Sequence, residues 1–98
     1  MVILITLVSG MNIIGEADYL ADDDDLKIKN PRIIVSQFTP KGELQCALVP
    51  TIHRFARTQP KTISIHRSNI IDPVLVDDDI DEEMVKNYKA NVAGIMLP

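Results

Sequence analysis

The segment that most constrains the fold is Val2–Val8, which is apolar at every position except Thr6. Successive side chains of a strand point to opposite faces, so a strand of this composition has to bury both of its faces. The segment is also too short to cross a membrane, and we predict no membrane partner. We expect the chain's own core to cover one face and a neighbouring subunit of a homo-oligomer to cover the other.

The composition favours strands in the rest of the chain as well. Ile and Val together outnumber Leu, only 4% of the residues are aromatic, and there is no Trp. Branched side chains suit a pleated, half-buried surface. The length of 98 residues allows a single domain, residues 1–98. Cys46 is the only cysteine, so no disulfide stabilises this small domain. Oligomerisation is then a common route to stability, and a lone thiol fits the reducing cytoplasm.

Turn residues divide the chain into about five strands followed by one helix. Ser9–Asn12 and Thr39–Gly42 predict turns between strands. The expected strands are Val2–Val8, Ile13–Leu20, Leu26–Phe38 with an interruption at Asn30 and Pro31, Leu44–Val49, and Thr62–Val76 broken near Asn69 and Pro73. The predicted fold is therefore mainly β: a small, five-stranded, bent antiparallel barrel of the SH3 type over residues 1–76.

Apolar residues recur at helical spacing near the C-terminal end of the sequence. They are Ile80, Met84, Val85, Tyr88 and Val92. The spacing predicts a helix over residues 80–93. We expect Asp79, with Glu82 three residues later, to begin it, and Gly94 to end it. The tail Ile95–Pro98 is apolar, and we expect it to dock on another surface.

Two residues predict local irregularities in the strands. Gly15 lies within an apolar strand, where glycine marks a bend or a close approach of another backbone. Pro31 lacks an amide hydrogen, so we expect it at a sheet edge or at a bulge.

The net charge of −4 conceals an uneven distribution. Residues 26–67 contain eight Lys or Arg residues and one acid, Glu43, whereas the rest of the chain has two Lys and thirteen acids. A basic middle between acidic flanks predicts faces of opposite charge, and it keeps nucleic acid among the candidate partners.

Two short segments carry a resemblance to a known family. Residues 7–17 read Leu-x-x-Gly-x-x-Ile-x-Gly-x-Ala, which is similar to the first Sm motif. Residues 67–71 read Arg-Ser-Asn-Ile-Ile, which looks like the second Sm motif with Ser68 in place of its Gly. The layout resembles Sm/LSm-like proteins of the Hfq superfamily, in particular small Sm-like proteins encoded by tailed phages and cyanophages.

The resemblance implies a fold, an assembly and a ligand. The family's five bent strands close a barrel, its subunits join edge to edge into a ring, and single-stranded RNA binds near the pore. At the position where the family has an Asn that bonds uracil this chain has Asp25, and at the stacking position it has Asp23. A carboxylate offers no amide donor and no ring. The alternative is therefore a phage-derived ring that acts as a scaffold for protein interactions and does not bind RNA.

Besides Asp25, at the position of the family's uracil-binding Asn, two groups of residues are candidates for binding RNA. His66, Arg67 and Asn69 either line the pore or form a polar turn in which Asn69 takes a left-handed backbone conformation. The second group is Arg54, Phe55, Arg57 and Lys61. These residues either clamp phosphates around a stacking ring or form a solvated loop with Phe55 packed inward, and the composition favours the solvated loop.

The remaining motifs predict no catalysis. The acidic segments Asp22–Asp25 and Asp77–Asp81 lack the Gly and Glu of a calcium loop, so we interpret them as solvated turns and a helix cap. Cys46 with His53 or His66 would make a nucleophile and base, but we expect Cys46 to be buried in an apolar strand. We predict no enzyme, no metal and no cofactor.

Overall fold

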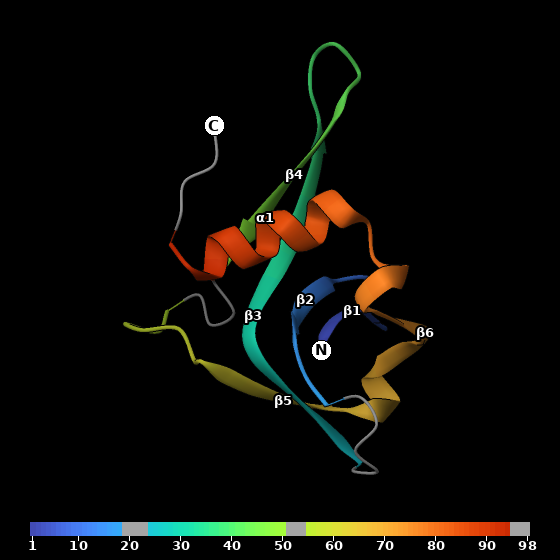
Figure 1. Cartoon of the computed structure of the whole chain (residues 1–98), viewed down its shortest axis with the longest axis vertical. Coiled ribbons are helices and arrows are strands. Elements are labelled where there is room, and N and C mark those ends of the chain that lie inside the picture. The colour runs from blue at the N-terminus through green and yellow to red at the C-terminus, as the bar shows by residue number, and fades with distance from the viewer. Residues whose placement is uncertain (19–23, 51–54, 95–98) are drawn as a thin grey trace.

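A computed structural model of the chain describes residues 1–18, 24–50 and 55–94 (Figure 1). Within these ranges the chain is mainly β, with two short 3-10 turns and one C-terminal helix. The elements are β1 (Val2–Leu7), β2 (Asn12–Glu16), β3 (Asp25–Phe38), β4 (Leu44–Val49), β5 (Thr62–His66), η1 (Arg67–Asn69), β6 (Ile70–Val76), η2 (Asp77–Asp79) and α1 (Glu82–Val92).

The strands form one antiparallel sheet in the order β4-β3-β2-β1-β6, with β5 also paired to β3. The long strand β3 uses one edge for β2 and the other edge for β5 and β4 in turn. The mainly β class with a C-terminal helix is confirmed, but the described residues form six strands rather than the predicted five. The predicted fifth strand is divided at Arg67–Asn69, close to the expected break at Asn69, whereas Pro73 lies inside β6.

The buried side chains form two clusters on the two faces of the sheet. The inner cluster is Ile3, Ile5, Ile13, Leu26 and Ile28, with Ile63, Ile65, Ile70 and other half-buried side chains around it. The outer cluster is Val2, Ile14, Ile80 and Tyr88, with Leu4, Ile34, Leu48 and the apolar side of α1 packed against it. Strand β1 therefore contributes to both clusters, as its apolar composition predicted.

On the outer face of β1, where we expected a neighbouring subunit, Val2 and Leu4 pack on side chains of the same chain. Figure 1 shows α1 crossing that side of the sheet, and Met84, Val85 and Val92 pack on the outer cluster. The chain thus covers its first strand twice by itself. The helical spacing of apolar residues in the sequence indicated this contact, because such spacing gives α1 an apolar side that has to pack on another surface.

Helix α1 begins two residues later than the sequence predicted. Its N-terminal cap is Asp81, whose Oδ1 accepts a hydrogen bond from the amide of Met84 at 3.2 Å. Asp79 instead belongs to η2, because Ile80 is extended and buried between the two elements. Gly94 follows the helix with φ of +73°, as expected of a terminating glycine.

Tyr88 holds β3 at the point where this strand bends, which is at Asn30 and Pro31. Its side chain is 1% exposed, and its Oη donates a hydrogen bond to the carbonyl of Asn30 at 2.8 Å. Asn30 has φ of +50°, and the β2–β3 register shifts opposite this segment. Pro31 is buried next to it, which confirms the predicted bulge. Burial, together with the nearby charge of Glu16, raises the pKa of Tyr88 to about 12.

Raising the pH from 10 to 12 is expected to destabilise the protein through Tyr88. The folded-state pKa is about 12, whereas a tyrosine in the unfolded chain titrates near 10. The stabilisation is complete below pH 10 and is lost as the pH rises through 12, about 2–3 kcal/mol in all. Urea unfolding of the wild type and of Tyr88→Phe between about pH 9 and pH 12 measures this loss of free energy of unfolding. Equal losses in both proteins would contradict the assignment.

Gly15 allows two strands to approach closely, as the sequence predicted. A Cβ atom at this position would run into the Ile28 side chain and would lie 3.2 Å from the Lys29 carbonyl oxygen. Both residues belong to the part of β3 that bends around β2. No other residue type fits this crossing without displacing β3.

The outer parts of β3 and β4 form a hairpin arm, residues 35–47, that extends beyond the rest of the molecule (Figure 1). Its tip is the predicted turn, in which the Gly42 amide bonds the Thr39 carbonyl at 2.8 Å and Gly42 has φ of +83°. Cys46 is exposed on this arm, so the prediction that it is buried is wrong. The strand is apolar, but its outer half reaches past both clusters.

Among the described residues, no helix is long and apolar enough to span a membrane. The apolar tail Ile95–Pro98, Tyr19 and Leu20 of the predicted second strand, and Arg54 lie outside the described residues.

Candidate nucleic-acid interface

The turn between β5 and β6 is organised by His66. Its Nδ1 accepts a hydrogen bond from the Ser68 amide at 3.2 Å and lies 2.7 Å from the Ser68 Oγ. Nδ1 acts as an acceptor here, so the proton of the neutral ring is on Nε2. The imidazole thereby caps η1 and holds Arg67, Ser68 and Asn69 in a single tight turn.

Pairing between β3 and β5 brings Asp25 next to the turn of Arg67–Asn69. Asp25 is the cross-strand partner of His66, and the Arg67 amide donates to the Asp24 carbonyl at 2.9 Å. Four predicted site residues, Asp25, His66, Arg67 and Asn69, therefore lie at one end of the β3–β5 pair. The Asn69 carbonyl accepts from the Val8 amide at 2.9 Å, which fastens the turn to the end of β1.

The turn departs from one sequence-based expectation. Asn69 is not among the described residues with a positive φ, which apart from glycine are Asn30 and Asp77. The left-handed backbone proposed for Asn69 is therefore wrong. A 3-10 turn reverses the chain there instead, because the His66 cap supplies the hydrogen bond that the turn needs.

The basic loop before β5 lies apart from this turn. Arg57 and Lys61 are exposed, and the Lys61 carbonyl accepts from the Asn30 amide at 2.7 Å at the start of β5. The turn of His66 lies at the opposite end of the same strand, so the structure does not merge the two groups into one site. Phe55 is 94% exposed, and the prediction that it packs inward is wrong.

Sequence reasoning missed the surface that joins these two groups. Between them lies the ribbon face, which we define as the exposed side chains of paired strands β3 and β5. Its members are Asp25, Lys27 and Lys29 on β3 and Thr62, Ser64 and His66 on β5. The period-two alternation of each strand was visible in the sequence, but nothing in it gave the pairing between them.

Carboxylates border the ribbon face on the β2 side. Glu16 and Asp18 line a shallow groove of about 430 Å³ together with Lys27, Lys29 and Thr62. Glu16 is the cross-strand partner of Lys29 and accepts a hydrogen bond from the Asn30 side chain at 3.3 Å. The lysines thus have acidic neighbours toward β2 and hydroxyl neighbours toward β5.

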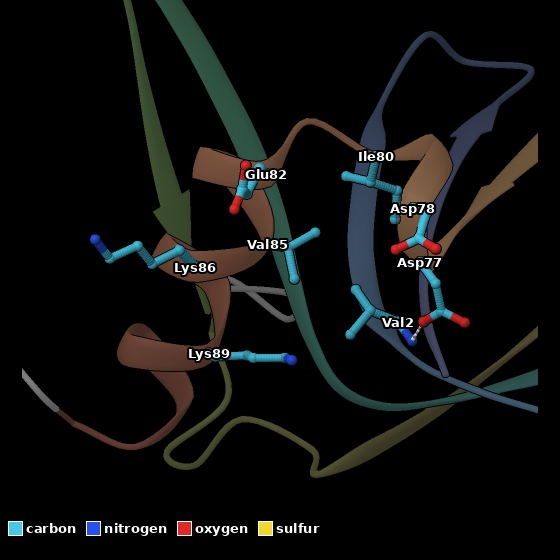
Figure 2. A pocket seen from close by; sticks show the side chains of 8 residues that line it. All are labelled: Val2, Asp77, Asp78, Ile80, Glu82, Val85, Lys86 and Lys89. Atoms are coloured by element: carbon cyan, nitrogen blue, oxygen red, sulfur yellow. Dashed lines mark hydrogen bonds between the residues drawn. The ribbon is translucent and has the colours of Figure 1, made fainter.

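A larger groove of about 890 Å³ separates α1 from η2 (Figure 2). Asp77 and Asp78 line one side, and the Asp77 Oδ1 accepts from the Val2 amide at 2.9 Å. Lys86 and Lys89 belong to α1, and Figure 2 shows Lys86 pointing away from both carboxylates. Asp77 therefore has a structural role, which is to hold the first residue of β1. In the ranges that the structure covers, no three His, Cys, Asp or Glu side chains are grouped to hold a metal ion.

A scan against known protein-family models finds no match to this chain. A search of curated protein sequences likewise finds no match.

Proposed function

We propose that this protein is an Sm-like protein that assembles into a homo-oligomeric ring and binds single-stranded RNA in the cytoplasm. The observation that carries the proposal is the turn of Arg67 and Asn69, which is capped by His66 and hydrogen-bonded to the Asp24 backbone. Short polar turns beside basic strands suit unstacked RNA, whose bases expose their edges.

The strand order supports an Sm-type barrel. Strand β5 pairs with β3 and β6 pairs with β1, so they occupy separate parts of the sheet. Only the three residues of η1 join them. The sheet must therefore curve until these parts approach each other, with the inner cluster enclosed between them. This curvature is what the resemblance to the Sm family implies.

The chemistry of the turn favours bases that carry amino groups. Asp25 is exposed beside the turn, and an ionised carboxylate only accepts hydrogen bonds. Adenine and cytosine each offer an exocyclic amino donor, whereas the carbonyl oxygens of uracil would face the carboxylate as a second acceptor. The Asn69 amide and the His66 ring supply further polar contacts, and Arg67 supplies the positive charge for a phosphate.

Fluorescence anisotropy with oligo-A, oligo-C and oligo-U at low salt tests this function. We expect sub-millimolar binding that weakens with salt, and a preference of about tenfold for oligo-A or oligo-C over oligo-U. Asp25→Asn, which restores an amide donor of the same size, should remove that preference. Failure to bind any of the three, or binding independent of salt, would refute the RNA-binding part of the proposal.

The hairpin arm supports self-association. Val35, Phe38 and Leu44 are 46%, 75% and 59% exposed, which is unusual for large apolar side chains gathered on one arm. In the described sheet, the outer edge of β4 has no partner strand, and β6 forms the other end of the order. We place the contact between subunits at these two edges, where backbone groups remain available for pairing.

Light scattering is expected to give a mass of several subunits at micromolar concentration. The double variant Phe38→Ser/Leu44→Ser should lower that mass, because it removes two exposed apolar side chains that face each other across the arm. Val8→Ser is the matched control, since Val8 is 64% exposed in the β1–β2 turn, away from the arm. A wild type that is monomeric at micromolar concentration would refute the ring.

The second candidate is a ring that serves as a protein scaffold without RNA. The exposed acids Asp24 and Asp25 favour it, because carboxylates beside the turn repel phosphates. Wild-type protein that is oligomeric by light scattering and yet binds none of the three oligonucleotides would support this candidate over the first.

A further inference from the structure

We propose that the ribbon face is the track for the phosphate backbone of a bound single strand, leading it to the turn of His66–Asn69. This inference rests on the proposed RNA-binding function and adds the path of the ligand. It assigns Lys27, Lys29, Thr62 and Ser64 as contacts to phosphates, and none of them belongs to either motif that suggested the function.

The pairing register supplies the first argument. Lys27 lies opposite Ser64 and Lys29 lies opposite Thr62, so the face contains two adjacent pairs of an ammonium and a hydroxyl group. Lysine provides a point charge for phosphate oxygens and Ser or Thr provides a neutral donor, which are the groups that usually contact a nucleic-acid backbone. Side chains two residues apart on a strand lie on the same face, so the ammonium–hydroxyl pair is repeated along the strands. A phosphate backbone, which also repeats along its length, can contact both pairs.

The rigidity of the surface is the second argument. The inward side chains of the same strands are Leu26 and Ile28, both buried, and the half-buried Ile63 and Ile65. The alternation therefore fixes every polar side chain of this face toward solvent. The Asn30 amide bond to the Lys61 carbonyl anchors the start of β5, and the Arg67 amide bond to the Asp24 carbonyl anchors its other end.

The surrounding charges define the direction of the track. Glu16 and Asp18 border the lysines on the β2 side, where a phosphate would be repelled. Lys61 is exposed at the start of β5. The favourable path therefore runs along the β5 side of the ribbon face, from Lys61 toward His66. At the His66 end of the ribbon face, the sugar-phosphate backbone of the RNA comes close to Asp25. Because this carboxylate repels phosphates, the bases and not the phosphates must face it.

The test compares two double variants that remove the same charge from different surfaces. Lys27→Gln/Lys29→Gln alters the ribbon face, and Lys86→Gln/Lys89→Gln alters two exposed lysines of α1, away from both the ribbon face and the hairpin arm. Glutamine keeps most of the side-chain length. Anisotropy with the oligonucleotide that binds the wild type best is measured over a range of salt concentrations, and circular dichroism confirms that each variant is folded.

We expect the ribbon variant to bind at least about tenfold more weakly at low salt, with a log–log salt slope smaller by about 1.4, the value for two lost phosphate contacts on a single strand. The control should bind nearly as tightly as the wild type. Equal weakening of both variants, or an unchanged ribbon variant, would overturn the track while leaving the RNA-binding function in place. A wild type that binds no oligonucleotide would overturn both proposals.

Discussion

Replacing Tyr88 by alanine is expected to lower the free energy of unfolding by about 3–5 kcal/mol, the usual cost of deleting a buried aromatic ring. The ring is 1% exposed and belongs to the outer cluster with Val2, Ile14 and Ile80. The substitution leaves a cavity between α1 and the sheet and removes the hydrogen bond to the Asn30 carbonyl. Urea unfolding followed by circular dichroism measures the loss.

Tyr88→Phe separates the hydroxyl from the ring. It keeps the packing but leaves the Asn30 carbonyl without the 2.8 Å hydrogen bond from Tyr88, at a cost of about 1–3 kcal/mol. A matched control is Lys86→Ala on the exposed side of the same helix, which should change stability by less than about 0.5 kcal/mol. If the alanine and phenylalanine variants of Tyr88 were equally stable, the ring would contribute nothing to the free energy of unfolding. That result would contradict its packing in the outer cluster.

Gly15→Ala is expected to cost about 3 kcal/mol, because the added methyl group meets Ile28 and the Lys29 carbonyl. The backbone of β3 would have to move away from β2 to accommodate it. Gly42→Asn is the control: nothing lies near a Cβ at Gly42, and Asn tolerates its positive φ. Urea unfolding of both variants measures the difference.

A double-mutant cycle makes the Gly15 test specific. Ile28→Ala alone is destabilising, but it also removes the side chain that the new methyl group meets. The double variant should therefore lose less stability than the sum of the two single variants. Additive losses would show that the crowding at Ile28 is not the cause.

The elements that sequence reasoning predicted are those fixed by local chemistry. Gly42 and Pro40 specify the turn of the arm, Gly94 specifies the end of α1, and Gly15 specifies the close approach of two strands. Each depends on a conformation or a space that one residue type provides. The same reasoning misplaced the start of α1. Asp77–Asp81 contains four aspartates that could cap the helix, and Asp81 is the cap because Ile80 is buried in an extended conformation just before it.

The long-range contacts were beyond sequence reasoning. Cys46 looked buried because its strand is apolar, but burial depends on whether another element reaches that part of the arm. Asp25 and Arg67 were singled out separately, from two different segments, and only the pairing of β3 with β5 brings them to one turn. Lys27 and Lys29 were overlooked because their significance depends on the register between β3 and β5, which pairs them with Ser64 and Thr62, residues far away in the sequence.

The double covering of β1 has a consequence for how the chain folds. Strand β1 is synthesised together with its hairpin partner β2, whereas its other partners β6 and α1 comprise residues 70–76 and 82–92 and are synthesised much later than β1. Pairings between distant segments form slowly, and an apolar strand without partners is prone to aggregate. Val2–Leu7 therefore keeps one edge and its outer face uncovered until residues 70–92 have been made, and those residues then turn an aggregation-prone segment into an interior strand between β2 and β6.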